Sequence, residues 1–289
     1  MSLVTVALET LALLERGTWN DPRGVDRDVR AALAAAVAGT RSFDPDALAA
    51  LAAAPTAPDA AAPPTRIEVS DETTQVASHR LAVLDGVADV AVLDFASAVE
   101  PGGGFIRGAR AQEEDLCRCS GLFPCLAPQR AYYARNRVPR EQLWDPAVAE
   151  RAHLYTDHVL YAPRVPFFRT RGSAPPDAPW LASVIVAPAP NAGSALAVDP
   201  DLAPRIAPIL YRRAAHVLGL ARALGHRALV LGAWGCGAFG NDPVVAADAF
   251  GRWLEAPANR GAFERVVFAV YDPRPPRHNL AAFRARFCR

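Results

Sequence analysis

The sequence contains no lysine and one methionine among its 289 residues, so arginine supplies every strongly basic side chain. We attribute the arginine and the abundant alanine to a GC-rich genome rather than to chemistry. The absence of lysine excludes a Walker P-loop, and no GxSxG motif is present, which argues against an ordinary NTPase and a serine hydrolase. No apolar run reaches the roughly 18 residues of a membrane span, and residues 1–20 lack the pattern of a secretory signal, so we expect a cytoplasmic protein.

Net charge and metal-ligand patterns are also sparse. The formal net charge is +1, so an anionic partner has to be held by local groups, and we expect a compact ligand rather than nucleic acid. Cys117 and Cys119 are too close in sequence for a CxxC pair, and no nearby histidine completes a zinc set with Cys125. We therefore predict packed thiols in a reducing cytosol, with no metal and no cofactor.

The hydrophobic pattern divides the chain into two parts. Apolar residues at helical spacing in residues 1–52 predict a helical N-terminal region, and the alanine- and proline-rich stretch 54–64 predicts a loop or hinge. Residues 65–289 alternate short apolar runs with amphipathic helices, which is typical of an α/β catalytic domain. We predict that residues 1–64 and 65–289 form one structural unit. The predicted strands are residues 66–70, 90–95, 158–161, 184–187, 228–232 and 266–271.

A run of glycines followed by acids is the most informative segment. It leads from a predicted strand through Gly102, Gly103 and Gly104 to a helix start at Gln112, Glu113 and Glu114. Consecutive glycines allow positive φ and let a ligand approach peptide N–H groups, so a ribose or a phosphate can be accommodated. Acids in a first helical turn are also favoured by the helix dipole. Beside a sugar-binding turn, however, one negative charge raises the proton affinity of its neighbour, and burial decides between the two interpretations.

A second glycine-rich segment follows the predicted strand at 228–232. Gly235, Gly237 and Gly240 spell GxGxxG, the pattern of a Rossmann loop. A Rossmann loop opens its unit and needs an acid about 20 positions on, whereas here the following strand is the last one and ends near Asp272. The Rossmann interpretation is therefore disfavoured. A glycine turn at a helix N-terminus still offers N–H groups to a pyrophosphate, and we predict that a diphosphate binds here.

Together the two loops resemble those of bacterial-type poly(ADP-ribose) glycohydrolases. The GGG, seven residues and QEE at 102–114 are similar to the GGG-x(6–8)-QEE signature of that family, and DLCR at 115–118 is similar to its bacterial branch. The segment GAWGCGAFG at 232–240 is similar to the family's GxWGCGxFG loop. The resemblance covers most of the chain from about residue 65. It implies a three-layer α/β/α macrodomain-like fold with a mixed central sheet and an N-terminal helical extension.

The same resemblance implies hydrolysis of the ribose–ribose O-glycosidic bonds of poly(ADP-ribose), with release of ADP-ribose. Glu114 is the implied general acid and base, and Glu113 is the residue implied to orient ribose hydroxyls. Phe239 is implied to pack on the ribose beside the scissile bond, Ser97 to contact a ribose, and Glu72 to accept from the adenine amino group. The implied binding residues are Gly102, Gly103, Gly104, Gln112, Gly235, Cys236, Gly237, Ala238, Phe239, Ser97 and Glu72.

The implied partners are poly(ADP-ribose) chains and ADP-ribosylated proteins, bound by a monomer that does not contact a membrane. Alternatives are a non-catalytic ADP-ribose reader, which would not need the acids, a hydrolase of mono-ADP-ribosylated proteins, and a Rossmann oxidoreductase. A helix cap formed with Thr73 or Thr74 is an equally good interpretation of Glu72. The sequence leaves open whether the enzyme cuts at chain ends or within chains.

Overall fold

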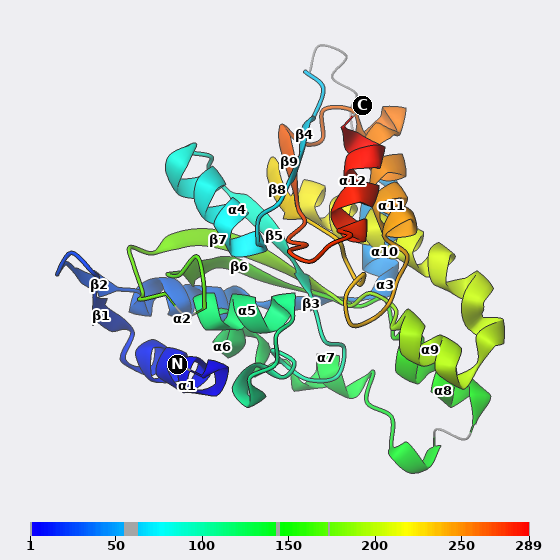
Figure 1. Cartoon of the computed structure of the whole chain (residues 1–289), viewed down its shortest axis with the longest axis horizontal. Helices are drawn as coiled ribbons and strands as arrows, with labels where there is room; N and C mark the ends of the chain where they lie inside the picture. The colour runs from blue at the N-terminus through cyan, green and yellow to red at the C-terminus, as the bar shows by residue number, and fades with distance from the viewer. Residues whose placement is uncertain (1, 55–62, 143–144, 173, 289) are drawn as a thin grey trace.

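A central mixed sheet organises the molecule in this computed structural model (Figure 1). Among residues 2–54, 63–142, 145–172 and 174–288, which the structure describes, seven strands form this sheet. In spatial order they are β3 (Arg41–Phe43), β6 (Val159–Phe167), β7 (Trp180–Ala187), β5 (Val90–Phe95), β8 (Ala228–Leu231), β9 (Arg265–Ala269) and β4 (Arg66–Ser70). Strands β7, β5, β8, β9 and β4 are parallel, whereas β6 is antiparallel to both of its neighbours. The carboxyl ends of the five parallel strands therefore meet at one edge.

Helices cover both faces of the sheet because successive strand residues point to opposite sides. In β5, Ala91 and Leu93 belong to one core and Val90 and Val92 to the other. The first core is covered by α3 (Pro45–Ala53), α10 (Ala203–Ala223), α11 (Pro243–Glu255) and α12 (His278–Phe287). The second is covered by α2 (Arg30–Gly39), α4 (Thr74–His79), α5 (Gln112–Cys119), α6 (Leu122–Leu126) and α7 (Arg130–Ala134). The predicted three-layer fold is confirmed.

The N-terminal residues are built into this architecture. Helix α1 (Leu3–Arg16) packs on α5 and on the short helix η2 (Phe105–Arg107), and β3 is an edge strand of the main sheet. Strands β1 (Thr18–Asn20) and β2 (Asp26–Asp28) form a separate hairpin. The buried carboxylate of Asp21 holds its turn by accepting the peptide N–H groups of Arg23 and Val25, at 2.8 and 3.0 Å.

The remaining helices are short or lie outside the two helical layers. They are η1 (Arg80–Leu84), η3 (Arg140–Gln142), α8 (Pro146–Leu154), α9 (Ala192–Val198), η4 (Pro200–Leu202) and η5 (Pro257–Asn259). No helix in the described part of the chain is both long and apolar enough to cross a membrane.

The predicted strands are all present, with differences at their ends. Strands β4 and β5 have the predicted bounds, whereas β6 continues to Phe167 and β7 begins at Trp180, where the two strands pair around an irregularity. Strands β1 to β3 were not predicted, because each has three residues and little apolar character. Most of the predicted hinge at 54–64 lies outside the described residues, which exclude 55–62.

Candidate active site

Glu113 binds the backbone of the first glycine loop at two points, Ser97 and Gly102. Its Oε2 accepts the peptide N–H of Ser97 at 2.7 Å, and its Oε1 accepts that of Gly102 at 3.1 Å. The side chain is buried, and burial raises its pKa above the ordinary range, with the charge of Asp94 as the next cause. The two peptide donors act in the opposite direction. Burial thus excludes the interpretation of Glu113 as an exposed helix-start acid.

Glu114 is held by one oxygen only. Its Oε1 accepts the peptide N–H of Gly104 at 2.8 Å, whereas its buried Oε2 has no hydrogen-bond partner among the described residues. Gly102 and Gly103 have φ of 68° and 55°, the left-handed region that favours glycine. This backbone brings the loop's N–H groups onto the two carboxylates, so the glycine run positions the acids.

Gln112 closes the end of β5. Its Oε1 accepts the N–H of Phe95 at 2.8 Å, and its Nε2 donates to the carbonyl of Leu93 at 2.8 Å and to the Thr74 hydroxyl at 3.0 Å. These bonds occupy the side-chain amide and tie α5 to both β5 and α4. Gln112 therefore fixes the distance between the strand end and the acids.

Asp94 is a third buried acid in this region, and the sequence did not suggest a role for it. The residue is 0% exposed, and neither carboxyl oxygen has a partner in the part of the chain that the structure describes. Burial raises its pKa well above the ordinary range, and the charge of Glu114 raises it further. Unlike Glu113, Asp94 accepts no peptide N–H group that would counteract these two effects on its pKa.

The second glycine loop, between β8 and α11, carries free peptide donors. Among the described residues, no acceptor is bonded to the N–H groups of Gly235, Gly237, Ala238 and Phe239. The N–H of Val244 is capped by the Asp242 carboxylate at 2.8 Å. The free donors therefore belong to the loop, whereas the N–H of Val244 in the first turn of α11 is already bonded. Such a group of N–H donors suits an anion.

Asn241 and Gly193 hold this loop against the segment that follows β7. The buried Asn241 donates from Nδ2 to the carbonyls of Pro190 and Gly235, at 2.8 and 3.0 Å. The peptide N–H of Gly193 donates to the carbonyl of Phe239 at 2.9 Å. The backbone of Phe239 is thereby held against the segment that follows β7.

Tyr155 packs against Phe239 from the other side, with ring centroids 6.1 Å apart. Its backbone has φ of 61°, which is unusual for a residue other than glycine. The fully buried Arg213 holds this conformation by donating to the carbonyls of Tyr155 and Leu154, at 2.9 and 2.6 Å, and to the Asp157 carboxylate at 2.6 Å. A strained residue that a buried cation fixes beside Phe239 indicates that Tyr155 and Phe239 form a wall of the candidate site.

Two implied binding residues are engaged within the protein. Both carboxylate oxygens of Glu72 accept from the Arg80 guanidinium, at 3.1 and 2.7 Å, which lowers the pKa of Glu72 against the effect of its burial. The hydroxyl of Ser97 accepts the N–H groups of Val99 and Glu100, at 3.3 and 3.1 Å. Thr73 is the N-cap residue of α4, so Glu72 is not its helix cap.

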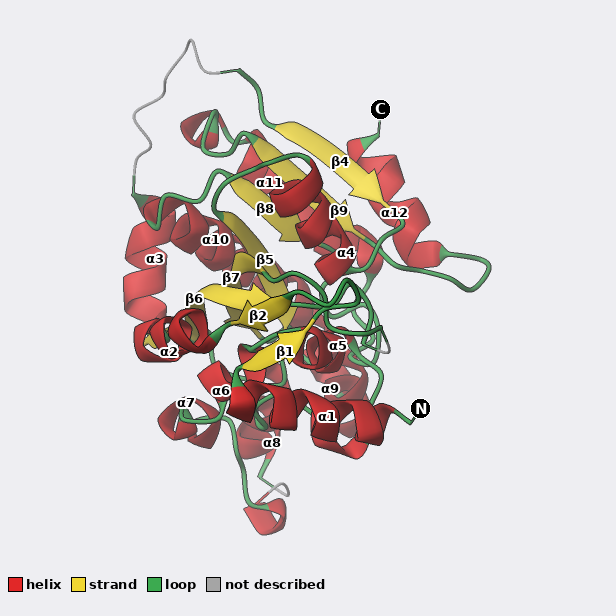
Figure 2. Cartoon of the chain, turned by 90° about the vertical axis from the view of Figure 1, so that its left-hand side faces the viewer, coloured by secondary structure: helices red, strands yellow, loops and turns green. Residues whose placement is uncertain are grey.

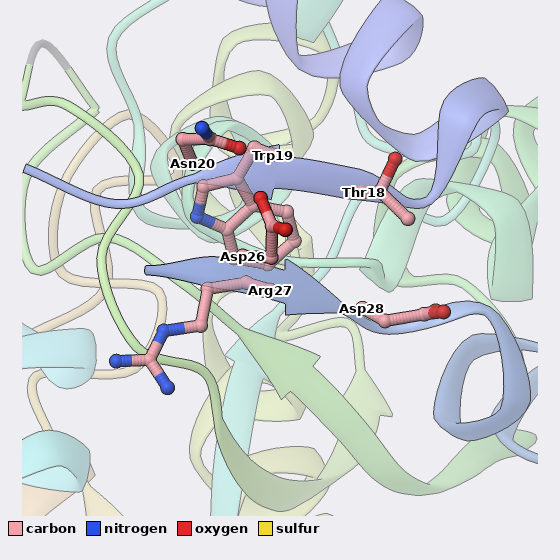
Figure 3. Close-up of a pocket in the computed structure, with 6 residues that line it drawn as sticks. All are labelled: Thr18, Trp19, Asn20, Asp26, Arg27 and Asp28. Carbon is pink, nitrogen blue, oxygen red and sulfur yellow. The ribbon is translucent and has the colours of Figure 1, made fainter. Parts of the chain in front are cut away.

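Other candidate sites are separate from this one. The pocket in Figure 3 is lined by the β1–β2 hairpin and shares no residue with the acids, and its Arg27 is paired with Asp21 at 2.6 Å. Among the described residues, no group of three or more histidine, cysteine or acidic side chains could hold a metal ion. Cys117, Cys119 and Cys125 are buried free thiols, as predicted, and burial raises the pKa of each.

Residues 7–170 match the family model "Microbial-type PARG, catalytic domain". The structure is similar to poly(ADP-ribose) glycohydrolase from Thermomonospora curvata, with a TM-score of 0.87, 42% identity and 99% of each chain covered. The same enzyme bound to the inhibitor ADP-HPD gives 0.85, 41% and the same coverage. Poly(ADP-ribose) glycohydrolase from Deinococcus radiodurans in complex with ADP-ribose gives 0.75 and 43%, covering 88% of this chain and 96% of that one. No curated protein matches the chain.

Proposed function

Because this chain belongs to the microbial-type poly(ADP-ribose) glycohydrolase family, we propose that Glu114 is the acid and base with which it cleaves its substrate. The enzyme hydrolyses the ribose–ribose O-glycosidic bonds of poly(ADP-ribose) and releases ADP-ribose. One observation carries the assignment of Glu114. Its Oε1 is fixed by the Gly104 N–H, while Oε2 has no partner among the described residues and can carry the transferred proton.

The reaction requires two proton transfers at Oε2 of Glu114. In the first, the carboxyl gives its proton to the 2′ oxygen of the leaving ribose as the bond from that oxygen to the anomeric carbon breaks. The anomeric carbon then carries oxocarbenium character. In the second, the carboxylate takes a proton from the water that attacks this carbon, which restores the acid. One water is consumed, and the products are ADP-ribose and a shorter chain.

The residues around Glu114 supply positioning. Glu113 orients the ribose hydroxyls from a carboxylate that Ser97 and Gly102 hold in place. Gly103 and Gly104 lie beside the ribose, and the absent Cβ of Gly103 leaves room for the Glu114 carboxylate, whose Oε1 is 2.5 Å from that position. Gln112 contributes by holding the end of β5 in place, because its amide is bonded there. We also propose that Ser97 contacts a ribose.

The second loop binds the diphosphate of the unit that is released. Its free N–H groups, among the described residues, are at Gly235, Gly237, Ala238 and Phe239, with Cys236 contributing its small side chain and backbone to the turn. Phe239 packs on the ribose beside the scissile bond. Strands β9 and β4 lie beyond β8, and Glu72 follows β4, which suits a contact with adenine at the far end of the ligand. ADP-ribose thus crosses the sheet edge from the acids toward β4.

We further propose that the enzyme acts in the cytoplasm as a monomer, on poly(ADP-ribose) attached to proteins.

The Glu114→Gln variant tests the central assignment. Glutamine keeps the shape of the side chain and the acceptor for the Gly104 N–H, but it cannot exchange a proton at neutral pH. We expect no ADP-ribose release from labelled poly(ADP-ribose), and an ADP-ribose dissociation constant by calorimetry within threefold of the wild-type value. Turnover retained by this variant would refute the role of Glu114.

A further inference from the structure

The two glycine loops differ in what their peptide N–H groups can still bind. Among the described residues, the second loop keeps free donors. In the first loop, the two glutamates and the Ser97 hydroxyl already accept the N–H groups of Ser97, Val99, Glu100, Gly102 and Gly104. The N–H of Gly103 is bonded to the carbonyl of Glu100 at 3.0 Å. A phosphate on this side of the scissile bond therefore has to be held by side chains.

Guanidinium groups are the available side chains there. Arg137 donates from Nε to the carbonyl of Val99 at 2.7 Å, and Arg107 pairs with the carboxylate of Glu100. Two arginines from separate segments thus attach to neighbouring residues of the loop that precedes the three glycines. The charge of Glu114 contributes to a raised pKa of Arg107, after its Glu100 partner, which places this guanidinium within electrostatic reach of the catalytic acid.

Both cations are accessible to a ligand. The side chain of Arg107 is 68% exposed, and that of its partner Glu100 is 44% exposed. An exposed ion pair of this kind is weak, so a phosphate can compete with the carboxylate. Arg137 is exposed, and its Nε is bonded to a carbonyl rather than to an acid. Arginine suits this role because its guanidinium is always charged.

The position of the two arginines fits the part of the substrate beyond the scissile bond. The released unit extends from the first loop across β8 toward β9 and β4. Helix α7, which Arg137 follows, lies at the opposite end of the molecule from these strands in both views (Figures 1 and 2). The rest of the chain has to leave the site on that side, and its next unit carries a diphosphate.

We propose that Arg107 and Arg137 form a binding site for the diphosphate of the next ADP-ribose unit, on the leaving side of the scissile bond. This inference rests on the proposed function. The site makes poly(ADP-ribose) a better substrate than an ADP-ribose glycoside whose leaving group carries no phosphate. It also gives a protein of net charge +1 a local means of holding a polyanion.

The experiment compares two substrates in the double variant Arg107→Gln/Arg137→Gln. Glutamine keeps an N–H donor without the charge. One substrate is poly(ADP-ribose), and the other is the α-p-nitrophenyl glycoside of ADP-ribose, which has no phosphate beyond the bond that breaks. We expect kcat/KM on poly(ADP-ribose) to fall about tenfold at low salt, and the value on the glycoside to stay within twofold. The slope of log kcat/KM against log salt concentration should decrease by roughly 0.7 for each phosphate that the variant no longer neutralises.

Two controls separate charge from structure. The variant Arg107→Lys/Arg137→Lys should remain within threefold of the wild type on poly(ADP-ribose), because it keeps the charge. The variant Arg284→Gln removes an exposed arginine of α12 and should change neither substrate's kinetics. An equal decrease on both substrates, an unchanged rate on poly(ADP-ribose), or failure of the lysine variant would overturn the site. A wild-type enzyme inactive on both substrates would instead contradict the proposed function.

Discussion

Gly103 lies so close to Glu114 that a Cβ built on Gly103 would stand 2.5 Å from Glu114 Oε1. The same Cβ would stand 3.2 Å from Glu113 Oε2. Neither glutamate can retreat freely, because peptide N–H groups of the loop hold both carboxylates. The two carboxylates thus lie in the space that a side chain at residue 103 would need.

The Gly103→Ala variant should therefore lose activity by displacing Glu114. The added methyl group must push the carboxylate away from Gly104, and a displacement of about 1 Å can cost on the order of 100-fold in rate. We expect kcat to fall by about that factor, while circular dichroism and the unfolding transition indicate a folded protein. The φ of 55° strains an alanine backbone, which should lower the free energy of unfolding by roughly 1–2 kcal/mol.

Gly86→Ala is the matched control for this variant. Gly86 also has a positive φ, of 66°, but a Cβ there would meet no atom within 4 Å. The control should lose a similar free energy of unfolding and keep wild-type kcat. If both variants lost activity equally, backbone strain rather than contact with Glu114 would be the cause.

The local parts of the site could be predicted from sequence, because each depends on neighbouring residues. The glycine run and the acids Glu113 and Glu114 are adjacent in the chain, and a strand followed by glycines indicates a loop at a sheet edge. Their burial could not be predicted, since it depends on α1, α4 and the sheet together. Asp94 gave no signal either, because an acid at a strand end is ordinary until its partners are seen to be absent.

The wall around Phe239 could not be predicted for a different reason. Tyr155 lies far from the second loop in sequence, and only the fold brings it there. Asn241 directly follows Gly240, but its partner Pro190 is distant in sequence. Arg213 lies in a long amphipathic helix, where an arginine is usually exposed, yet it is 1% exposed and bonded to backbone carbonyls. Edge strand β3 was missed because Arg41 and Ser42 give it a polar sequence.

The Asp94→Asn variant should change how stability depends on pH. Folding raises the pKa of Asp94, so the protonated form stabilises the folded protein. This contribution to stability is fully present below the ordinary aspartate pKa range and is lost as pH rises through the raised pKa. Asparagine has no proton to lose. We expect the free energy of unfolding of the variant, relative to wild type, to increase between pH 5 and 8, by at most about 1.4 kcal/mol per pH unit. Urea denaturation at several pH values measures this difference.

Asp21→Asn provides a control of opposite sign. The Asp21 carboxylate accepts from Arg27 and from two peptide N–H groups, which lower its pKa against the effect of burial. Its contribution to stability is present above the ordinary aspartate range and is lost as pH falls through the lowered value. The loss caused by Asp21→Asn should thus be larger at pH 7 than in acid. If the difference in free energy of unfolding between Asp94→Asn and wild type did not change with pH, Asp94 would be ionised in the folded protein.

Tyr155 should act through Phe239, which a double-mutant cycle can detect. Aromatic pairs contribute roughly 0.5–1.5 kcal/mol beyond buried area, so Tyr155→Ala should lower kcat/KM by about two- to tenfold. In the Phe239→Ala background the same substitution should have less than a twofold effect, because the ring it supports is gone. Tyr155→Phe keeps the ring and should retain most of the activity. Effects that multiply independently would mean that Tyr155 contributes only to folding.

Asn241 should affect binding of the diphosphate more than the chemical step. In Asn241→Asp, a carboxylate oxygen replaces the Nδ2 donor and faces the carbonyls of Pro190 and Gly235, so the loop should move away from the segment after β7. We expect KM and the ADP-ribose dissociation constant to rise about tenfold, with kcat within threefold of wild type. The matched control is Asn259→Asp, which removes a donor to the Trp253 carbonyl far from either glycine loop. It should lose a comparable free energy of unfolding without any change in KM, and equal KM increases in both variants would contradict a specific role for Asn241.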